Sequence, residues 1–76
     1  MNDWIYLKNS RPATGRKFIL FFASPLILHN GQSTIKYSGE YDGFELQLNG
    51  ILRDTLHRIE IDVINNFEIY WQYKEG

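Results

Sequence analysis

The chain has 76 residues, a formal net charge of −1 and no cysteine. This length fits one domain spanning residues 1–76, and the missing cysteines exclude disulfides, thiolate metal sites and cysteine nucleophiles. Small domains without disulfides depend on a dense core, a metal or association with another chain. Because Trp, Tyr and Phe make up 16% of the residues, we expect an aromatic core, with some rings left for an interface.

Charge and hydropathy limit the partners and the location. Residues 1–36 carry five cations and one acid, whereas residues 37–76 carry three cations and eight acids, giving +4 and −5. Such a charge dipole is not typical of a nucleic-acid-binding protein. No segment approaches the roughly 20 apolar residues of a membrane span, and the first residues do not resemble a secretory signal. We therefore expect a cytoplasmic protein without a membrane partner.

The N-terminal segments predict a short strand followed by a loop. Residues 4–7 are apolar enough for a first strand, and residues 9–15 have the composition of a loop. Pro12 suits the second position of a turn, and Gly15 can adopt a positive φ angle.

The next segment predicts a strand covered on both sides. Residues 18–23 are apolar on both faces, which is typical of such a strand. Ser24 and Pro25 interrupt the run, residues 26–28 can resume it, and residues 29–31 are expected to turn the chain.

A hairpin is predicted around Asp42-Gly43. Apolar residues alternate before and after this dipeptide, and Asp-Gly is a strong signal for a two-residue turn. Directly opposed residues share a face of a sheet. The turn would therefore align two apolar sets, pairing Tyr41 with Phe44, Gly39 with Leu46, and Tyr37 with Leu48.

A second hairpin is predicted near the C-terminus. Residues 59–63 and 67–73 both alternate between apolar and polar positions. A two-residue turn would oppose their apolar faces, whereas a three-residue loop over residues 64–66 aligns them. The preferred register pairs Val63 with Phe67, Ile61 with Ile69, and Ile59 with Trp71.

A helix over residues 52–64 is the competing interpretation of the same region. Its apolar residues have helical spacing, and Asp54 or Thr55 could cap it. The β-branched run favours a strand from about residue 58, and a short helical turn over residues 51–57 stays open. The predicted fold is mainly β, a small antiparallel sheet or SH3-like partial barrel of about five strands with room for one short helix.

The sequence shows no catalytic or metal-binding constellation. His29 and His57 lie far apart without spaced partner ligands, although the fold could bring them near Asp54 or Glu60. Three serines lack a nucleophile motif such as Gly-x-Ser-x-Gly: Ser24, Ser33 and Ser38. We therefore expect a protein that is not an enzyme and has no cofactor.

A basic loop is a candidate anion-binding site. Arg11, Gly15, Arg16 and Lys17 surround the Pro-x-x-Gly turn, where backbone N–H groups and cations could meet a phosphate. No phosphate-loop motif accompanies them. The competing interpretation is a solvent-facing loop whose cations protect a very apolar strand from aggregation.

Aromatic residues among acids predict a surface for protein recognition. Tyr and Trp are the side chains that most often dominate protein–protein binding. A stacking site for single-stranded nucleic acid needs cations around exposed rings instead, so nucleic acid is disfavoured. An unpaired strand over residues 67–73 could also form a homodimer edge to edge. The candidate surface comprises Tyr37, Tyr41, Glu60, Asp62, Glu68, Tyr70, Trp71 and Tyr73.

Several short motifs resemble a family of small uncharacterised proteins from phages, prophages and other mobile elements. The motifs are Trp4-Ile5-x-Leu7, Ser10-x-Pro12-x-x-Gly15, Phe18-x-Leu20, Gly39-x-Tyr41-Asp42-Gly43 and Tyr70-Trp71-Gln72-Tyr73. Tyr70 stands where that family has His, and the family's proline-rich end is replaced by Lys74-Glu75-Gly76. The resemblance implies a mobile-element setting and no reaction.

The functional prediction is a non-enzymatic protein-binding module. In a phage or mobile-element setting, it would engage or inhibit a host protein. Two alternatives are a small β-barrel that binds single-stranded nucleic acid, and a small homo-oligomer whose aromatic patch is a subunit interface.

Overall fold

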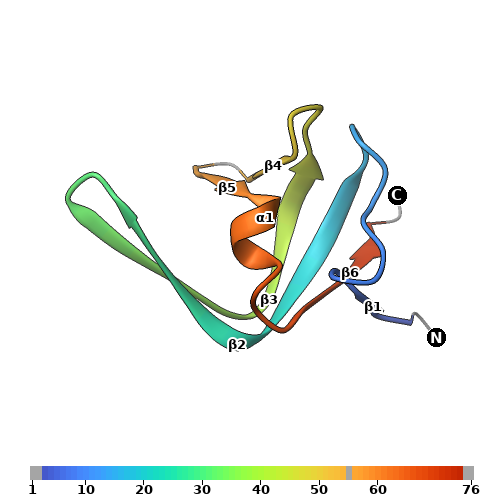
Figure 1. Ribbon diagram of the computed structural model, residues 1–76, viewed down its shortest axis with the longest axis horizontal. Coiled ribbons are helices and arrows are strands. Elements are labelled where there is room, and N and C mark those ends of the chain that lie inside the picture. The colour runs from blue at the N-terminus through green and yellow to red at the C-terminus, as the bar shows by residue number, and fades with distance from the viewer. Residues whose placement is uncertain (1–2, 55, 75–76) are drawn as a thin grey trace.

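The computed structural model describes residues 3–54 and 56–74, and they fold into one curled antiparallel sheet with a short helix (Figure 1). The elements are β1 (Ile5–Tyr6), β2 (Lys17–Asn30), β3 (Ser33–Leu46), β4 (Ile51–Arg53), β5 (Arg58–Glu60), α1 (Ile61–Ile64) and β6 (Ile69–Tyr73). The strand order is β1-β6-β2-β3-β4-β5. The prediction of a mainly β, partly closed antiparallel sheet with one short helix is confirmed.

The hairpin of β2 and β3 is the largest element of the sheet. Both strands have 14 residues, and Asn30 pairs with Ser33 across a two-residue turn. Gly31 has a φ of 63°, which suits the first central position of a type II′ turn. The chain does turn near the predicted residues 29–31, but the turn is centred on Gly31 and Gln32, and His29 and Asn30 still belong to β2.

The turn predicted at Asp42-Gly43 is wrong. β3 runs through this dipeptide, with Phe44 opposite Phe18 and Tyr41 opposite Leu20. Three steps along β3 thus match two along β2, so β3 holds a β-bulge here. Gly43 has a φ of 91°. Asp-Gly supplies the positive φ that a bulge needs as readily as the one a turn needs, which is why the local signal was ambiguous.

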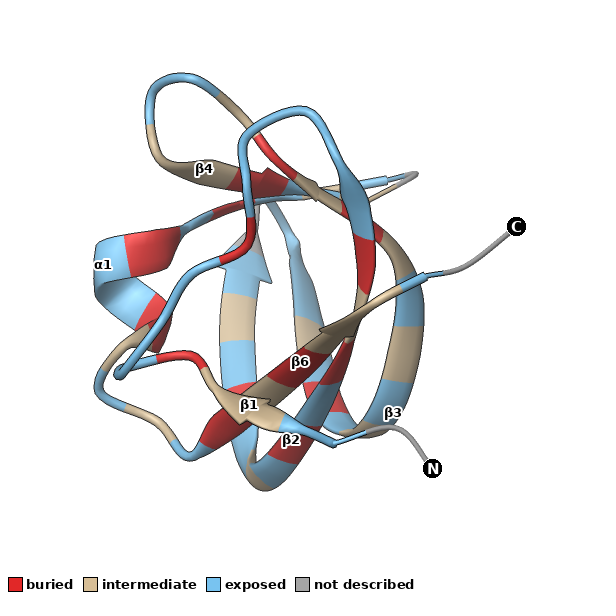
Figure 2. Cartoon of the chain, turned by 90° about the vertical axis from the view of Figure 1, so that its right-hand side faces the viewer, coloured by how far each residue is buried: buried red, intermediate tan, exposed pale blue. Residues whose placement is uncertain are grey.

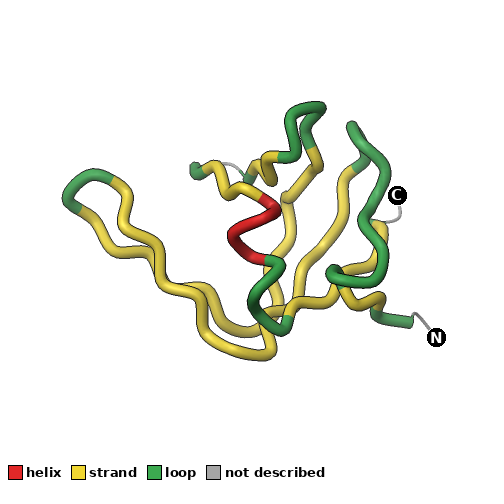
Figure 3. Tube along the Cα trace, viewed as in Figure 1, coloured by secondary structure: helices red, strands yellow, loops and turns green. Residues whose placement is uncertain are grey.

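A second irregularity bends the hairpin. Phe22 pairs with Gly39 and Leu26 with Tyr37, so β2 takes four steps where β3 takes two. Ser24 and Pro25 lie among these additional β2 residues, where the sequence predicted that the strand is interrupted. Proline is tolerated there because bulged residues do not take part in the hydrogen-bond ladder. Beyond it the hairpin extends away from the rest of the sheet (Figure 3).

The predicted C-terminal hairpin is also wrong. Ile59 lies in β5 opposite Leu52 of β4, and Ile69 and Trp71 lie in β6 opposite Phe22 and Leu20 of β2. The three predicted pairs of that hairpin therefore do not form. β6 lies between β1 and β2, so the predicted free edge at residues 67–73 is absent too.

Between β5 and β6 the chain forms one helical turn instead of continuing a strand. Ile61 and Ile64, three residues apart, are both buried, whereas Val63 is 45% exposed. Strand alternation would have buried Val63 with Ile61, so the interior selects the helical spacing. The competing helix over residues 52–64 does not form either, since its first part contributes to β4 and β5.

The open question of residues 51–57 is settled for most of that segment. Ile51–Arg53 is the strand β4, and Asp54, Leu56 and His57 are not helical. Thr55, a suggested cap, lies outside the described residues.

The core lies inside the curl of the sheet and is closed by α1 and the loop after β1. Buried positions alternate along β2 and β6 (Figure 2). Phe18, Phe22 and Phe44 are among the largest fully buried side chains, with centroids of neighbouring rings 6.4 Å apart. The core residues are Leu7, Phe18, Leu20, Phe22, Leu26, Tyr37, Phe44, Leu46, Leu52, Ile59, Ile61, Ile64, Ile69 and Trp71.

The bulge at Gly43 yields a prediction for stability. A Cβ at this position would meet no atom within 4 Å, so Gly43→Ala strains only the backbone. We expect it to lower the free energy of unfolding by about 1–2 kcal/mol, measured by urea denaturation. Lys36→Ala, at an exposed β3 position with an ordinary φ, is the control and should change it by less than about 0.5 kcal/mol. An unchanged stability in Gly43→Ala would contradict the bulge.

Candidate functional site

Four aromatic side chains gather on the outer face of the sheet, opposite the core. Tyr6 of β1 pairs with Tyr70 of β6, and Tyr70 pairs with Phe21 of β2, so the three lie in one row across neighbouring strands. Trp4, just before β1, packs against Phe21 with ring centroids 6.0 Å apart. We call these four residues the aromatic patch.

The aromatic patch is ordered yet open to solvent. The Tyr6 and Tyr70 rings have centroids 5.3 Å apart, while Trp4 and Phe21 are 36% and 38% exposed. A shallow hollow of about 380 Å³ lies between Trp4, Phe21, Tyr70 and the β3 residue Glu40. Rings that are held in place but remain exposed lose little conformational entropy on binding.

Acidic side chains flank the aromatic patch. Glu40 is paired directly with Phe21, and the Tyr70 hydroxyl donates a hydrogen bond of 3.0 Å to the Glu68 carboxylate. This hydrogen bond, together with partial desolvation, raises the pKa of Tyr70 above its ordinary value. The hydroxyl therefore stays protonated at neutral pH, and the surface combines apolar rings with two carboxylates.

The structure separates the residues of the predicted interaction surface. Tyr70 and Glu68 belong to the site. Tyr37 and Trp71, however, are only 3% and 2% exposed and lie in the core, so they cannot contact a partner. Trp71 faces inward with Ile69 because residues two apart along a strand share a face.

Tyr41 and Tyr73 are half-buried and packed against the core. The Tyr41 hydroxyl accepts a hydrogen bond of 3.1 Å from the Ser38 amide N–H. The Tyr73 hydroxyl accepts one of 2.9 Å from the Ala13 amide N–H. Both rings therefore support local structure.

The remaining two acids lie at a different part of the molecule. Glu60 is exposed at the end of β5, and Asp62 is exposed on α1. The Asp62 carboxylate forms an ion pair of 3.6 Å with Arg11. The predicted surface of eight residues is thus not one surface.

Trp4, Tyr6 and Phe21 were not among the residues predicted to form the interaction surface. Residues 18–23 are apolar on both faces, which predicted a strand covered on both sides, but only the inner face is covered. The alternation of Trp4 and Tyr6 with Ile5 and Leu7 was a usable signal, since it places the two rings on one face.

The basic loop does not form an anion-binding nest. The Gly15 amide N–H donates to the Leu46 carbonyl at 2.8 Å, and the Arg16 amide N–H donates to the Ala13 carbonyl at 3.3 Å. Both donors are therefore occupied.

The cations of this loop also diverge. The Arg16 guanidinium lies 3.6 Å from the centre of the Tyr73 ring, in a cation–π contact. Arg11 turns to Asp62, and Lys17 begins β2 opposite Glu45. The prediction of a convergent basic site is not supported by this arrangement.

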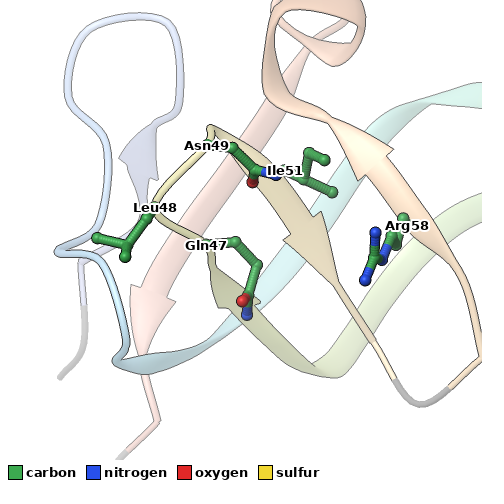
Figure 4. A pocket seen from close by; sticks show the side chains of 5 residues that line it. All are labelled: Gln47, Leu48, Asn49, Ile51 and Arg58. Atoms are coloured by element: carbon green, nitrogen blue, oxygen red, sulfur yellow. The ribbon is translucent and has the colours of Figure 1, made fainter.

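A pocket beside the first residue of β4 has no pair of side chains suited to catalysis. Its lining is drawn in Figure 4, and its volume is about 200 Å³. Arg58 is the one charged side chain among its lining residues, Gln47, Leu48, Asn49, Ile51 and Arg58. No acid and base face each other across it.

The histidines and the acids do not assemble a metal site in the described part of the chain. No group of three or more His, Asp and Glu side chains converges there. His29 contacts the Thr34 hydroxyl through Nδ1 at 3.2 Å, near the turn of the hairpin. His57 lies in the turn between β4 and β5.

Asp54 organises the turn between β4 and β5. Its Oδ1 atom accepts hydrogen bonds from the amide N–H groups of Leu56 and His57, and its Oδ2 atom accepts one of 2.9 Å from the Tyr37 hydroxyl. Burial alone would raise the pKa of Asp54, but these donors outweigh it and lower the pKa below its ordinary value of 3.8. Burial, together with the hydrogen bond to Asp54, raises the pKa of Tyr37 above its ordinary value.

Comparison with protein-family models, curated proteins and solved structures finds no match to this chain. The resemblance to mobile-element proteins therefore stays a prediction. Within the ranges that the structure describes, no helix has the length and apolar character needed to cross a membrane.

Asp54 yields a pH prediction. A carboxyl whose pKa is lowered by folding stabilises the protein above its unfolded-state pKa, and this contribution is lost as the pH falls through the folded-state value. We expect Asp54→Asn to be less stable than wild type at about pH 7, with the difference shrinking as the pH falls below about 3.8. Urea denaturation of both proteins at several pH values measures this. A difference that stays constant down to about pH 2 would contradict it.

Proposed function

We propose that this chain is a non-enzymatic protein-binding module whose contact surface is the aromatic patch. The observation that carries the proposal is the cluster of Trp4, Tyr6, Phe21 and Tyr70 on a sheet face that no other element of residues 3–54 and 56–74 covers. Tyr and Trp dominate the energetics of protein interfaces because they bury large areas and lose few rotamers. Contiguous exposed apolar patches on small proteins commonly mark such interfaces.

The charge around the aromatic patch defines the partner. Glu40 and Glu68 lie at its rim, so a complementary surface has an apolar centre and Lys or Arg at its edge. Phosphate groups would be repelled by the same carboxylates. Arg16, which could otherwise stack on a base, is placed over Tyr73. These features favour a protein partner over single-stranded nucleic acid.

The biological setting of the proposal comes from the sequence motifs. A small module of a phage or other mobile element would act in the cytoplasm of its host, where it engages or inhibits a host protein. A shallow, aromatic, acid-rimmed face suits this role because protein interfaces combine an apolar centre with a polar rim.

Affinity capture tests the proposal. The tagged chain is incubated with bacterial lysate and the retained proteins are identified. We expect the variant Trp4→Ser/Phe21→Ser to lose a specific partner by at least about tenfold, because each ring carries binding energy above roughly 1 kcal/mol. Leu48→Ser/Leu56→Ser is the matched control, since it removes two apolar residues that are 94% and 78% exposed and lie outside the patch. It should retain the partner.

Two outcomes would contradict the proposal. Equal capture by the patch and control variants would place the interface elsewhere. Salt-dependent binding of single-stranded DNA or RNA, abolished by Arg16→Ala/Lys17→Ala, would favour the nucleic-acid alternative.

A further inference from the structure

The distal half of the β2–β3 hairpin is a two-stranded arm with open edges. β6 pairs with β2 only from Phe18 to Phe22, and β4 pairs with β3 only at Glu45 and Leu46. Residues 26–37 therefore extend beyond both neighbours (Figure 1). Open strand edges present unpaired N–H and C=O groups, which can pair with another chain.

The open edge of β2 differs from the other edges in being protected neither by short length nor by charge. β1 and β5, the outer strands of the sheet, have two and three residues, and β5 carries Arg58 and Glu60. The open edge of β3 carries Lys36 and Glu40. From residue 18 to residue 35 the chain holds no Asp, Glu, Lys or Arg. Short length and charge are the usual protections against edge pairing, and the β2 edge has neither.

The pairing register shows which backbone groups are available on this edge. Asn30 and Ser33 flank the two-residue turn, so their N–H and C=O groups bond each other. Along an antiparallel pair these groups alternate in direction. Leu28 therefore bonds to β3, whereas the N–H and C=O groups of Ile27 and His29 point away from it.

Ile27 and Leu28 place one apolar side chain on each face of the arm, and His29 shares the face of Ile27. Ile27 is 53% exposed on the outer face. Leu28 is half-buried on the inner face, where it borders a hollow of about 430 Å³ that is also lined by Ile35, Leu56, His57 and Arg58. A strand added at this edge could bury Ile27 on the outer face and Leu28 on the inner face.

We propose that the open edge of β2 pairs with the same edge of a second copy of this chain. In antiparallel order about a two-fold axis at Leu28, Ile27 pairs with His29 of the second copy, and the two Leu28 residues face each other. This register gives four N–H···O bonds between the copies, because each Ile27–His29 pair exchanges two. The two sheets become one.

The absence of Asp, Glu, Lys and Arg from residues 18–35 favours a second copy of this chain over a foreign peptide as the partner. In a two-fold contact a segment meets itself, so any charge on it would meet a like charge near the axis. An uncharged segment avoids that repulsion and offers a charged peptide no partner. A contact of about five residues per strand buries less than the roughly 1,200 Å² of a stable interface. We therefore expect a reversible dimer that dissociates on dilution.

This interface is separate from the aromatic patch. The patch occupies the face formed by β1, β6 and the first half of β2, whereas the proposed contact uses the edge of the second half. A variant that disrupts the β2 edge therefore leaves the aromatic patch intact, and a variant of the patch leaves the edge intact.

Single-cysteine crosslinking tests the register. The chain has no cysteine, so a disulfide in Leu28→Cys can form only between copies. Facing residues of a non-hydrogen-bonded pair have Cα atoms about 4.5 Å apart, within disulfide range. Lys36→Cys is the control, since its counterpart would lie three strand spacings away, about 14 Å. We expect at least tenfold faster dimer formation in Leu28→Cys under mild oxidation.

Sedimentation velocity over a range of concentrations tests the association itself. Wild type should shift from monomer to dimer as concentration rises. Ile27→Lys should weaken the dimer at least tenfold by placing like charges near the axis, and Ile27→Pro should do so by removing an outward N–H. A circular dichroism spectrum equal to that of wild type shows that a variant is folded. One folded Ile27 variant is enough for the test.

Three results would overturn the proposal. The first is a wild type that remains monomeric at the highest concentration. The second is equal crosslinking rates for Leu28→Cys and Lys36→Cys. The third is a dimer that persists in a folded Ile27 variant but dissociates in Trp4→Ser/Phe21→Ser, which would place the interface at the aromatic patch.

Discussion

The pairing of β2 with strands on both of its sides is the constraint on which the rest of the structure depends. Its inner residues Phe18, Leu20 and Phe22 are almost fully buried, and its backbone bonds to β3 on one side and to β6 on the other. β6 in turn positions β1. The bulge at Gly43 and the irregularity at Ser24–Pro25 add local twist, which lets the two long strands curl around one core.

The same strand separates two kinds of surface. Its first half carries Phe21 on the outer face, between Tyr70 of β6 and Glu40 of β3, and so forms the centre of the aromatic patch. Its second half leaves the sheet and exposes an uncharged edge. A face and an edge can bind independently, so self-association through the arm would present two copies of the patch to a partner and raise its apparent affinity.

Sequence reasoning predicted the class of fold but not the strand pairing. The apolar alternation around residues 35–46 correctly indicated a strand, since a period of two is local information. Its partner was not local. Asp42-Gly43 fits both a turn and a bulge, and the choice depends on whether β2 is available to pair with β3. Ile61 and Ile64 likewise form a helical turn only because the curled sheet needs residues three apart on its inner side.

For the candidate site too, local alternation could be predicted from the sequence, whereas burial by distant strands could not. Tyr70 and Glu68 were found because alternation against Ile69 and Trp71 placed them on one face. Tyr37 and Trp71 were misplaced because an aromatic residue suits a core and an interface equally well. Phe21 was hidden within a continuous apolar run, and only the sheet order shows that its outer side stays 38% exposed beside Trp4.

Cross-strand nuclear Overhauser effects in the isotope-labelled protein report whether β2 pairs on both sides. We expect backbone contacts from Phe22 to both Gly39 and Ile69, with Phe18 opposite Phe44. Contacts pairing Gly39 with Leu46 and Ile61 with Ile69 would mean two separate hairpins, and would contradict it.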